Sequence, residues 1–139
     1  MFSYESHVGR LVEIRFGATL SLEDVRSVQE AATANLARRL GSVVSCVDMR
    51  YLNILRPDVA DALVLMLKRS NPRVERTACL LPSASATLAL QIERMHRDAG
   101  GSGRQTFRQA VDIVAWLGEV LDGRERDRLR MFLKLSGAL

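Results

Sequence analysis

The segment that most constrains the fold is a nearly unbroken apolar run, Val43–Met49, with the sequence VVSCVDM. A strand with one wet face alternates apolar and polar side chains, whereas a continuous apolar run of this length is typical of a strand covered on both faces, as in a parallel sheet. A second short run of the same kind, Thr77–Leu81, follows later in the chain. These two runs predict the buried centre of a sheet.

The beginning of the chain predicts a hairpin of two strands with one exposed face each. Phe2–His7 and Leu11–Phe16 alternate apolar and polar residues with a period of two. The intervening Gly9-Arg10 favours a tight connection, so the two strands are expected to run antiparallel.

One-sided helical patterns separate the remaining strands. Ser21 and Asp24 form an N-cap signature, and apolar residues at spacings of three and four continue from there to Leu40. Pro57 suits the first turn of a second helix, because its missing N–H group has no partner at that position anyway. Pro82-Ser83 is expected to start a third helix, and a fourth follows the weak strand Gln105–Phe107.

Alternating strands and helices predict an α/β fold with right-handed crossovers. We expect a mixed, mostly parallel sheet of about five strands with four crossover helices and a C-terminal helical tail. The expected organisation is one α/β domain over residues 1–122 and an amphipathic tail over residues 123–139. The tail carries Leu129, Phe132 and Leu133 on one stripe, so it docks either on its own domain or on a partner.

This order of elements resembles the STAS domain family, which includes the bacterial anti-sigma-factor antagonists. The resemblance covers residues 2 to about 121, and its best local support is the run VVSCVDMRYLNILRPDVADALVLML. In that family a buried strand ends in an acid or amide, a loop of about eight residues follows, and a helix opens at the regulatory site. Here Asp48 would end the strand, Tyr51–Arg56 would form the loop, and Pro57-Asp58 would open the helix.

The sequence departs from the family at the regulatory position. The family's phosphorylated serine falls ten residues beyond the strand-end acid, and that position is occupied here by Asp58. No serine or threonine lies between Cys46 and Lys68, so the family's phosphorylation switch cannot operate at this turn. Asp58 either supplies a permanent negative charge in place of phosphate, or is an early-helix acid favoured by the helix dipole.

The resemblance implies a regulatory module that binds a protein partner through this loop and the start of the second helix. The partner would be an anti-sigma factor of the kinase-like type or a larger signalling assembly. Four apolar loop residues (Tyr51, Leu52, Ile54 and Leu55) are expected to be exposed there, unless some of them fill the core. The residues expected to bind or regulate the partner are Asp48, Tyr51, Asn53, Ile54, Arg56, Asp58 and Asp61.

Few residues in the chain are suited to catalysis. The two histidines, His7 and His96, are expected at the surface, and the two cysteines, Cys46 and Cys79, are expected to be buried on strands. The sequence contains no HExxH, GxSxG or clustered Cys/His motif. We therefore expect no enzymatic activity, no metal and no cofactor.

The charge and the hydropathy of the chain limit the classes of partner that can be expected. The formal net charge is +4, and the basic residues are scattered among acids, which argues against a nucleic-acid partner. No apolar segment is long enough to span a bilayer, and no signal peptide is recognisable, so a cytoplasmic protein without membrane contact is expected. A homodimer is left open. The alternative function is binding of a small ligand or lipid in a pocket between the sheet and the second helix.

Overall fold

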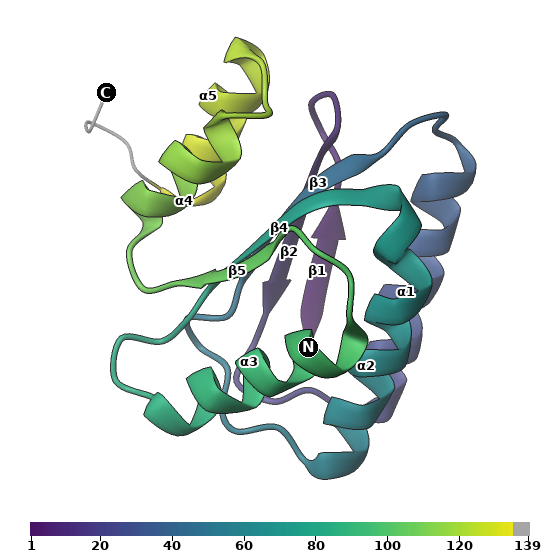
Figure 1. Cartoon of the computed structure of the whole chain (residues 1–139), viewed down its shortest axis with the longest axis vertical. Coiled ribbons are helices and arrows are strands. Elements are labelled where there is room, and N and C mark those ends of the chain that lie inside the picture. Colours follow the sequence, from purple (N-terminus) through teal and green to yellow (C-terminus); the bar gives the residue numbers. More distant parts are fainter. Residues whose placement is uncertain (135–139) are drawn as a thin grey trace.

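The computed structural model describes residues 1–134 and contains one five-stranded sheet with α-helices on both sides (Figure 1). None of the helices in this range combines the length and apolar character that crossing a bilayer requires. The elements, in chain order, are β1 (Phe2–Glu5), β2 (Leu11–Phe16), α1 (Leu22–Ala37), β3 (Val43–Asp48), α2 (Pro57–Ser70), the short 3₁₀ helix η1 (Asn71–Arg73), β4 (Val74–Leu80), α3 (Ala86–Ala99), β5 (Arg104–Phe107), α4 (Ala110–Gly118) and α5 (Gly123–Phe132).

The strands follow one another across the sheet in chain order, β1-β2-β3-β4-β5. β1 runs antiparallel to β2, as a tight hairpin requires, and the other neighbouring pairs are parallel. Gly9 in the hairpin has φ of +56°, a conformation that glycine adopts more readily than other residues. The predicted mixed, mostly parallel sheet is confirmed.

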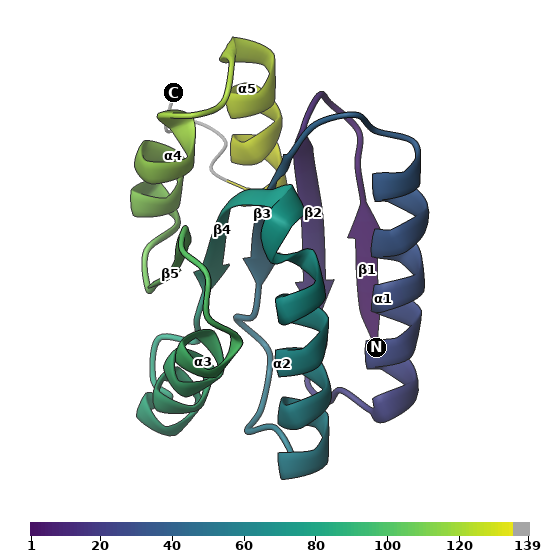
Figure 2. The same ribbon diagram turned by 45° about the vertical axis from the view of Figure 1, so that its right-hand side comes forward.

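The helices form two layers. α1, α2 and α3 connect the parallel strands and cover one face of the sheet, whereas α4 and α5 cover the other (Figures 1 and 2). All six residues of β3 are buried, and its side chains alternate between the two layers. Val47 packs under the α1–α3 layer, while Val44 and Cys46 pack under α4 and α5.

α1 begins as the sequence predicts but ends earlier. Ser21 and Asp24 form a complete capping box. The helix stops at Ala37 rather than reaching Leu40, whose side chain is fully exposed. The guanidinium of Arg73 accounts for this end, because it donates to the carbonyl oxygens of residues 36, 39 and 41 at 2.9–3.3 Å. The Leu36 carbonyl belongs to the last turn of α1, and those of residues 39 and 41 belong to the loop that follows, so Arg73 ties the helix end to this loop.

α2 starts at Pro57, as predicted, but α3 starts later than predicted. The expected start at Pro82-Ser83 is wrong: the helix opens at Ala86, and the Ser85 side chain accepts a hydrogen bond from the N–H group of Leu88. Residues 82–85 instead form the loop that follows β4. The difference has a simple cause, since both serines are good helix caps and sequence alone does not choose between them.

α5 packs on its own domain as far as the structure describes it. Leu129, Phe132 and Leu133 are buried in the core under α4, at 0%, 6% and 1% exposure. The predicted tail therefore docks in cis up to residue 134, and its last five residues lie outside the described part of the chain. The boundary predicted at residue 122 coincides with Asp122, the N-cap of α5.

Charged groups fix the position of α5 on β2. The Glu13 carboxylate, only 1% exposed, accepts two hydrogen bonds from the Arg128 guanidinium at 2.7 and 2.8 Å. Arg15 lies two residues further along the same face of β2 and donates to the Phe132 carbonyl at 2.8 Å. Its guanidinium carbon is 4.3 Å from the centre of the Phe132 ring. The bidentate Glu13–Arg128 pair fixes the geometry of the contact more than it adds stability.

We expect Leu129→Ala to lower the free energy of unfolding by about 2–5 kcal/mol, because it leaves a cavity in a fully buried site. The matched control is Met131→Ala on the exposed side of the same helix, which should change stability by less than about 0.5 kcal/mol. Urea denaturation followed by circular dichroism measures both. Equal, small effects of the two substitutions would show that α5 is not part of the folded core.

Candidate partner-binding site

The loop between β3 and α2 presents two large apolar side chains to solvent. Tyr51 is 67% exposed and Ile54 is 60% exposed, and Asn53 between them is exposed as well. Leu52 and Leu55 are both only 4% exposed and belong to the core under α1–α3. Of the two alternatives that the sequence leaves open, exposure therefore applies to Tyr51 and Ile54, whereas the two leucines fill the core and anchor the loop.

Hydrogen bonds hold this loop in one shape. The Gln91 side chain on α3 accepts from the N–H group of Leu55 at 2.9 Å and donates to its carbonyl at 2.8 Å. The N–H group of Asn53 donates at 2.9 Å to the carbonyl of Ala18, which lies in the loop after β2. The exposed residues thus stand on a backbone that is tied to two other segments of the chain.

A shallow open groove runs beside the loop, at the end of the sheet where β3 and β4 finish. Pro82 and Ala84, from the loop before α3, face Tyr51 and Ile54 across it. The remaining residues that line the groove are Arg50, Leu52, Asn53 and Ser85. Parallel strands place their following loops along one edge of the sheet, which explains why two loops far apart in sequence meet here. The local sequence patterns that predict the first loop contain no signal for the second.

The start of α2 carries an exposed ion pair. Arg56 donates to the Asp58 carboxylate at 2.8 Å, and the other oxygen of Asp58 accepts from the N–H group of Val59 at 2.9 Å. Asp61, one turn further along, is exposed. Asp58 thus binds one of the free N–H groups at the helix start, and its charge is matched by that of Arg56.

Asp48 lies inside the domain rather than at its surface. Its side chain is fully buried on the α5 side of β3, where it accepts from Arg15 at 2.8 Å and from Arg50 at 2.9 and 3.0 Å. Burial raises the pKa of the carboxyl group, but the hydrogen bonds and charges of Arg50, together with the charge of Arg15, lower the pKa by more. The ion pair fixes the side chain of Arg50, which lines the groove.

The predicted site residues thus fall into two groups. Tyr51, Asn53 and Ile54 lie along the loop, while Arg56, Asp58 and Asp61 follow on the first turns of α2. Asp48 is the exception, since it is buried and reaches the groove only through Arg50. Sequence reasoning missed Gln91 and the loop at residues 82–85, because both depend on contacts between distant segments. It also missed Arg50 as a residue of the groove, although Arg50 is held there by Asp48, only two residues earlier in the chain.

The two cysteines are buried among apolar groups, and one histidine lies partly buried beside them. Cys46 and Cys79 are free and buried, as predicted. The prediction that His96 lies at the surface holds only in part, because the residue is partly buried and its Nε2 atom is 3.8 Å from the sulfur of Cys79. Burial raises the pKa of Cys79 to about 12 and, with the charge of Arg104, lowers the pKa of His96 to about 4. Both groups are therefore neutral at pH 7, which disfavours a thiolate nucleophile.

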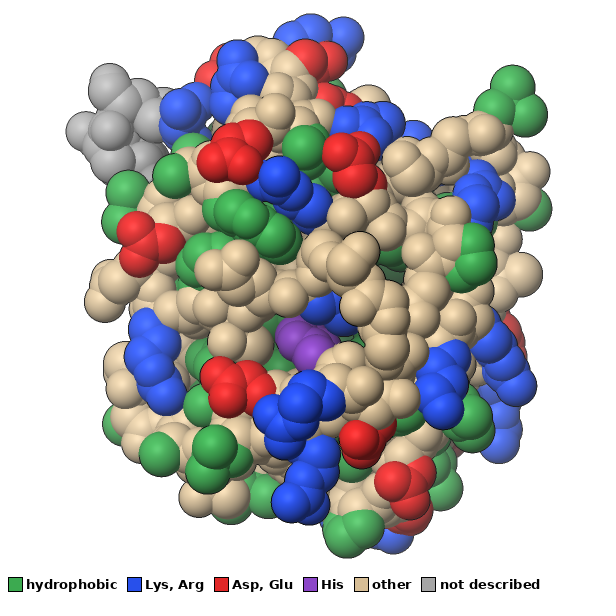
Figure 3. Space-filling view, viewed as in Figure 1, with side chains coloured by type: hydrophobic (Ala, Val, Ile, Leu, Met, Phe, Trp, Pro, Cys, Tyr) green, Lys and Arg blue, Asp and Glu red, His purple; other side chains and the backbone are tan. Residues whose placement is uncertain are grey.

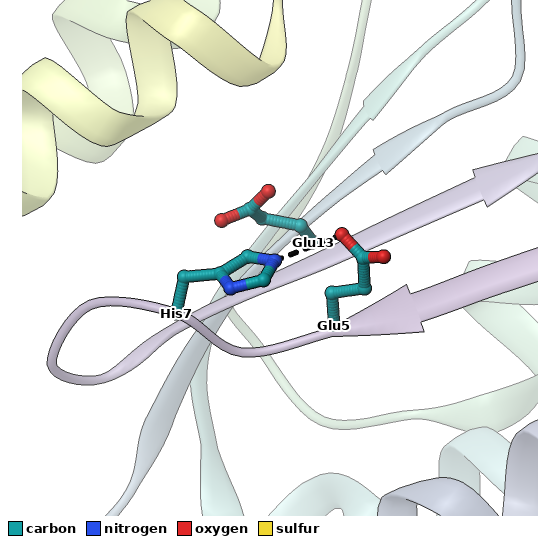
Figure 4. A group of neighbouring side chains, drawn as sticks. All are labelled: Glu5, His7 and Glu13. Carbon is teal, nitrogen blue, oxygen red and sulfur yellow. Dashed lines mark hydrogen bonds and ion pairs between the residues drawn. The ribbon is translucent and has the colours of Figure 1, made fainter.

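A further cluster of ionisable groups lies beside the β1–β2 hairpin. Glu5, His7 and Glu13 bring potential metal ligands within 4.8 Å of one another, and Nε2 of His7 is 2.9 Å from the Glu5 carboxylate (Figure 4). However, Glu13 already binds the Arg128 guanidinium through both of its oxygens. A cation at this position would have to displace that arginine, so the cluster is better explained as an ion-pair network.

Asp48→Asn is expected to lower the free energy of unfolding by about 1–3 kcal/mol at pH 7, because it removes the negative charge between two arginines and replaces one acceptor oxygen with a donor NH₂ group. The loss is smaller than for a fully buried pair, since Arg15 and Arg50 remain 30% and 32% exposed. The pKa of Asp48 lies below its ordinary value, so its stabilisation is complete above about pH 4 and is lost as the pH falls through the lowered pKa.

Urea denaturation at pH 7 and at pH 3 measures this effect, and the difference between variant and wild type should shrink at the lower pH. Asp127→Asn is the control, because this exposed acid pairs with Arg130 at the surface and should change stability by less than about 0.5 kcal/mol. A difference for Asp48→Asn that is equally large at both pH values would contradict the role assigned to the carboxylate.

Comparison with known proteins identifies the fold. No family model and no curated protein matches the sequence. An uncharacterised protein of the DUF3478 family from Shewanella loihica PV-4, with a SpoIIAA-like fold, superposes with a TM-score of 0.66 at 15% identity over 84% of this chain and 93% of that one. The anti-sigma factor antagonist SpoIIAA in its unphosphorylated form superposes with a TM-score of 0.59 at 16% identity, over 85% of this chain and 97% of SpoIIAA. The chain therefore has a SpoIIAA-like fold.

Proposed function

We propose that this protein is a non-enzymatic recognition module that binds another protein at the end of the sheet where β3 and β4 finish. The observation that carries the proposal is the exposure of Tyr51 and Ile54 on a firmly held loop beside an open groove. Aromatic side chains and arginine contribute most strongly to protein interfaces, and Tyr51 and Arg50 both line this groove. The partner would be an anti-sigma factor of the kinase-like type or a larger signalling assembly.

The rigidity of the loop supports this function. Buried Leu52 and Leu55 anchor the backbone from below, and Gln91 binds both the N–H and the carbonyl group of Leu55. Ordering a flexible loop on binding costs free energy for each side chain and backbone segment that is immobilised. A loop that already has its bound shape avoids most of this cost.

The neutral state of the buried thiol and imidazole supports a function without catalysis. Cys79 and His96 are adjacent, but their pKa values of about 12 and about 4 keep both of them uncharged at pH 7. A cysteine nucleophile acts as a thiolate, which neighbouring positive charge normally stabilises. The pair therefore lacks the charge distribution of an activated nucleophile and its base.

The contacts of Asp58 bear on how the site is regulated. Its carboxylate is paired with Arg56 and accepts from the first turn of α2. This arrangement favours the role of an early-helix acid, because the negative charge is largely compensated within the chain. We therefore infer that the module binds its partner without a phosphorylation-like signal at this turn.

The double substitution Tyr51→Ser/Ile54→Ser tests the proposed function. We expect it to reduce partner recovery at least about tenfold in affinity capture from the native cell, since loss of an interface hot spot costs about 2 kcal/mol or more. The matched control is Val111→Ser/Met131→Ser, which removes two similarly exposed apolar side chains from the α4–α5 face. Quantitative mass spectrometry compares what each variant recovers.

Both double variants should unfold at the temperature of the wild type, because all four side chains are mostly exposed. A partner that the loop variant retains, or that the control loses to the same degree, would refute the proposed site. A wild-type chain that captures no more protein than an unrelated domain does would refute the function itself.

A further inference from the structure

A cavity of about 100 Å³ lies between the sheet and the α1–α3 layer, away from the loop described above. Most of its lining is apolar, but several of the lining residues carry a sulfur atom or an imidazole ring. They come from four segments of the chain and are Met49, Met66, Cys79, Met95 and His96. Thiolate, thioether and imidazole groups are the ligands that soft metal ions prefer. The cavity therefore collects the ligand types of a soft-metal site.

Cys79 and His96 form the centre of this group. Cys79 on β4 is 2% exposed, and its Sγ atom lies 3.8 Å from Nε2 of His96 on α3. A metal ion that is bonded to sulfur at about 2.3 Å and to nitrogen at about 2.0 Å spans this separation at a bond angle of about 120°. The two atoms can therefore hold one ion where they stand, and this angle leaves room for a third ligand.

The methionines of the cavity can supply the third ligand. Met49 and Met95 are 6% and 5% exposed, and Met66 on α2 is partly buried. A methionine side chain has three rotatable bonds and a polarizable sulfur atom, so it can turn its thioether toward an ion inside the cavity. Because the ligands come from distant segments of the chain, no metal-binding motif is visible in the sequence.

The charge of Arg104 limits which ion can enter. Arg104 pairs in register with Thr77, so its side chain leaves the sheet on the same face as that of Cys79. Burial is the main cause of the shifted pKa values of Cys79 and His96, and the charge of Arg104 lowers both. The guanidinium of Arg104 forms no ion pair with any acid in residues 1–134, and its Nε–H group is buried without an acceptor. A second uncompensated positive charge beside it would be costly.

A monovalent ion meets this limit. Bound by the one thiolate of Cys79, it adds no net charge, whereas a divalent ion would leave a positive charge beside Arg104. Cu(I) is the monovalent ion that thiolate and thioether ligands select. Although burial raises the pKa of Cys79, a metal bound directly to the sulfur removes the thiol proton. A copper–sulfur bond forms, the proton passes to solvent, and copper stays Cu(I), so no oxidant or reductant takes part.

We propose that this cavity binds one Cu(I) ion through Sγ of Cys79 and Nε2 of His96, with a methionine thioether as the third ligand. His96 is only partly buried, so the ion can enter from the solvent side of this ligand. Figure 3 shows a hollow near α3 in which a histidine side chain and a cationic side chain lie together. The site is separate from the partner-binding loop and gives the protein a second binding function.

Anaerobic titration of the full chain with Cu(I), in competition with the coloured chelator bicinchoninate, tests the site. The wild type should bind one Cu(I) ion per chain, and an equimolar amount of Zn(II) should not displace it. Loss of an outer-shell partner already weakens metal binding by about 10–100-fold, so Cys79→Ala should lower the affinity at least about 100-fold. The matched control is Cys46→Ala, which removes the other buried thiol from the opposite face of the sheet and should leave the affinity unchanged.

Two measurements on the wild type do not depend on a variant's folding. X-ray absorption at the copper edge should show sulfur at about 2.3 Å and one imidazole nitrogen at about 2.0 Å. In methyl NMR spectra, Cu(I) should shift the signal of at least one cavity methionine (Met49, Met66 or Met95) and leave that of exposed Met131 unchanged.

A wild-type chain that retains no Cu(I) against the chelator, or methyl shifts confined to Met131, would overturn the site. Unchanged affinity in a folded Cys79→Ala variant, or an equal loss in Cys46→Ala, would overturn the assignment to Cys79. An absorption spectrum without an imidazole nitrogen would overturn the role of His96, and displacement of Cu(I) by Zn(II) would overturn the choice of metal.

Discussion

The burial of β3 on both of its faces is the constraint on which the rest of the structure depends. A strand with no exposed side needs one layer of apolar side chains above it and another below it. The crossover helices α1, α2 and α3 supply the first layer, and α4 and α5 supply the second. The end of this central strand then fixes where the loop to α2 begins, and therefore where Tyr51 and Ile54 reach solvent.

The two faces of the sheet are held in different ways. On the α5 side, buried acids on β2 and β3 bind arginines from several elements, and the Glu13–Arg128 pair fixes how α5 lies on the sheet. On the α1–α3 side the contacts are mainly apolar and leave a cavity under α2. The α5 side reaches the loop between β3 and α2 through Asp48 and Arg50, whereas the α1–α3 side holds a cavity of about 100 Å³.

The sequence predicts the elements whose signals are local. The continuous apolar run of β3 and the capping box of α1 are both where the pattern places them. Leu52 and Leu55 are spaced three residues apart, which is compatible with two anchors on one side of the loop, but the sequence alone leaves open which of the apolar loop residues are exposed. His96 follows Ile92 by four residues on the inward stripe of α3, a signal that would have placed it inside.

Contacts between distant segments could not be predicted in this way. Nothing in the sequence pairs Glu13 with Arg128, or brings Gln91 to Leu55, because each pair depends on how whole elements pack. The same holds for the groove between the two loops and for the unpaired donor of Arg104. A pocket between the sheet and the second helix was expected as an alternative, and a cavity lies there.

Amide hydrogen exchange tests most directly whether a rigid two-sided scaffold holds the recognition loop in shape. We expect the β3 amides to exchange only through global unfolding, and the loop amides of Leu52, Asn53 and Leu55 to be protected at least about 100-fold, because each donates a hydrogen bond. Loop amides that exchange at the rate of an unstructured chain, while β3 stays protected, would contradict a loop held in one shape by the scaffold.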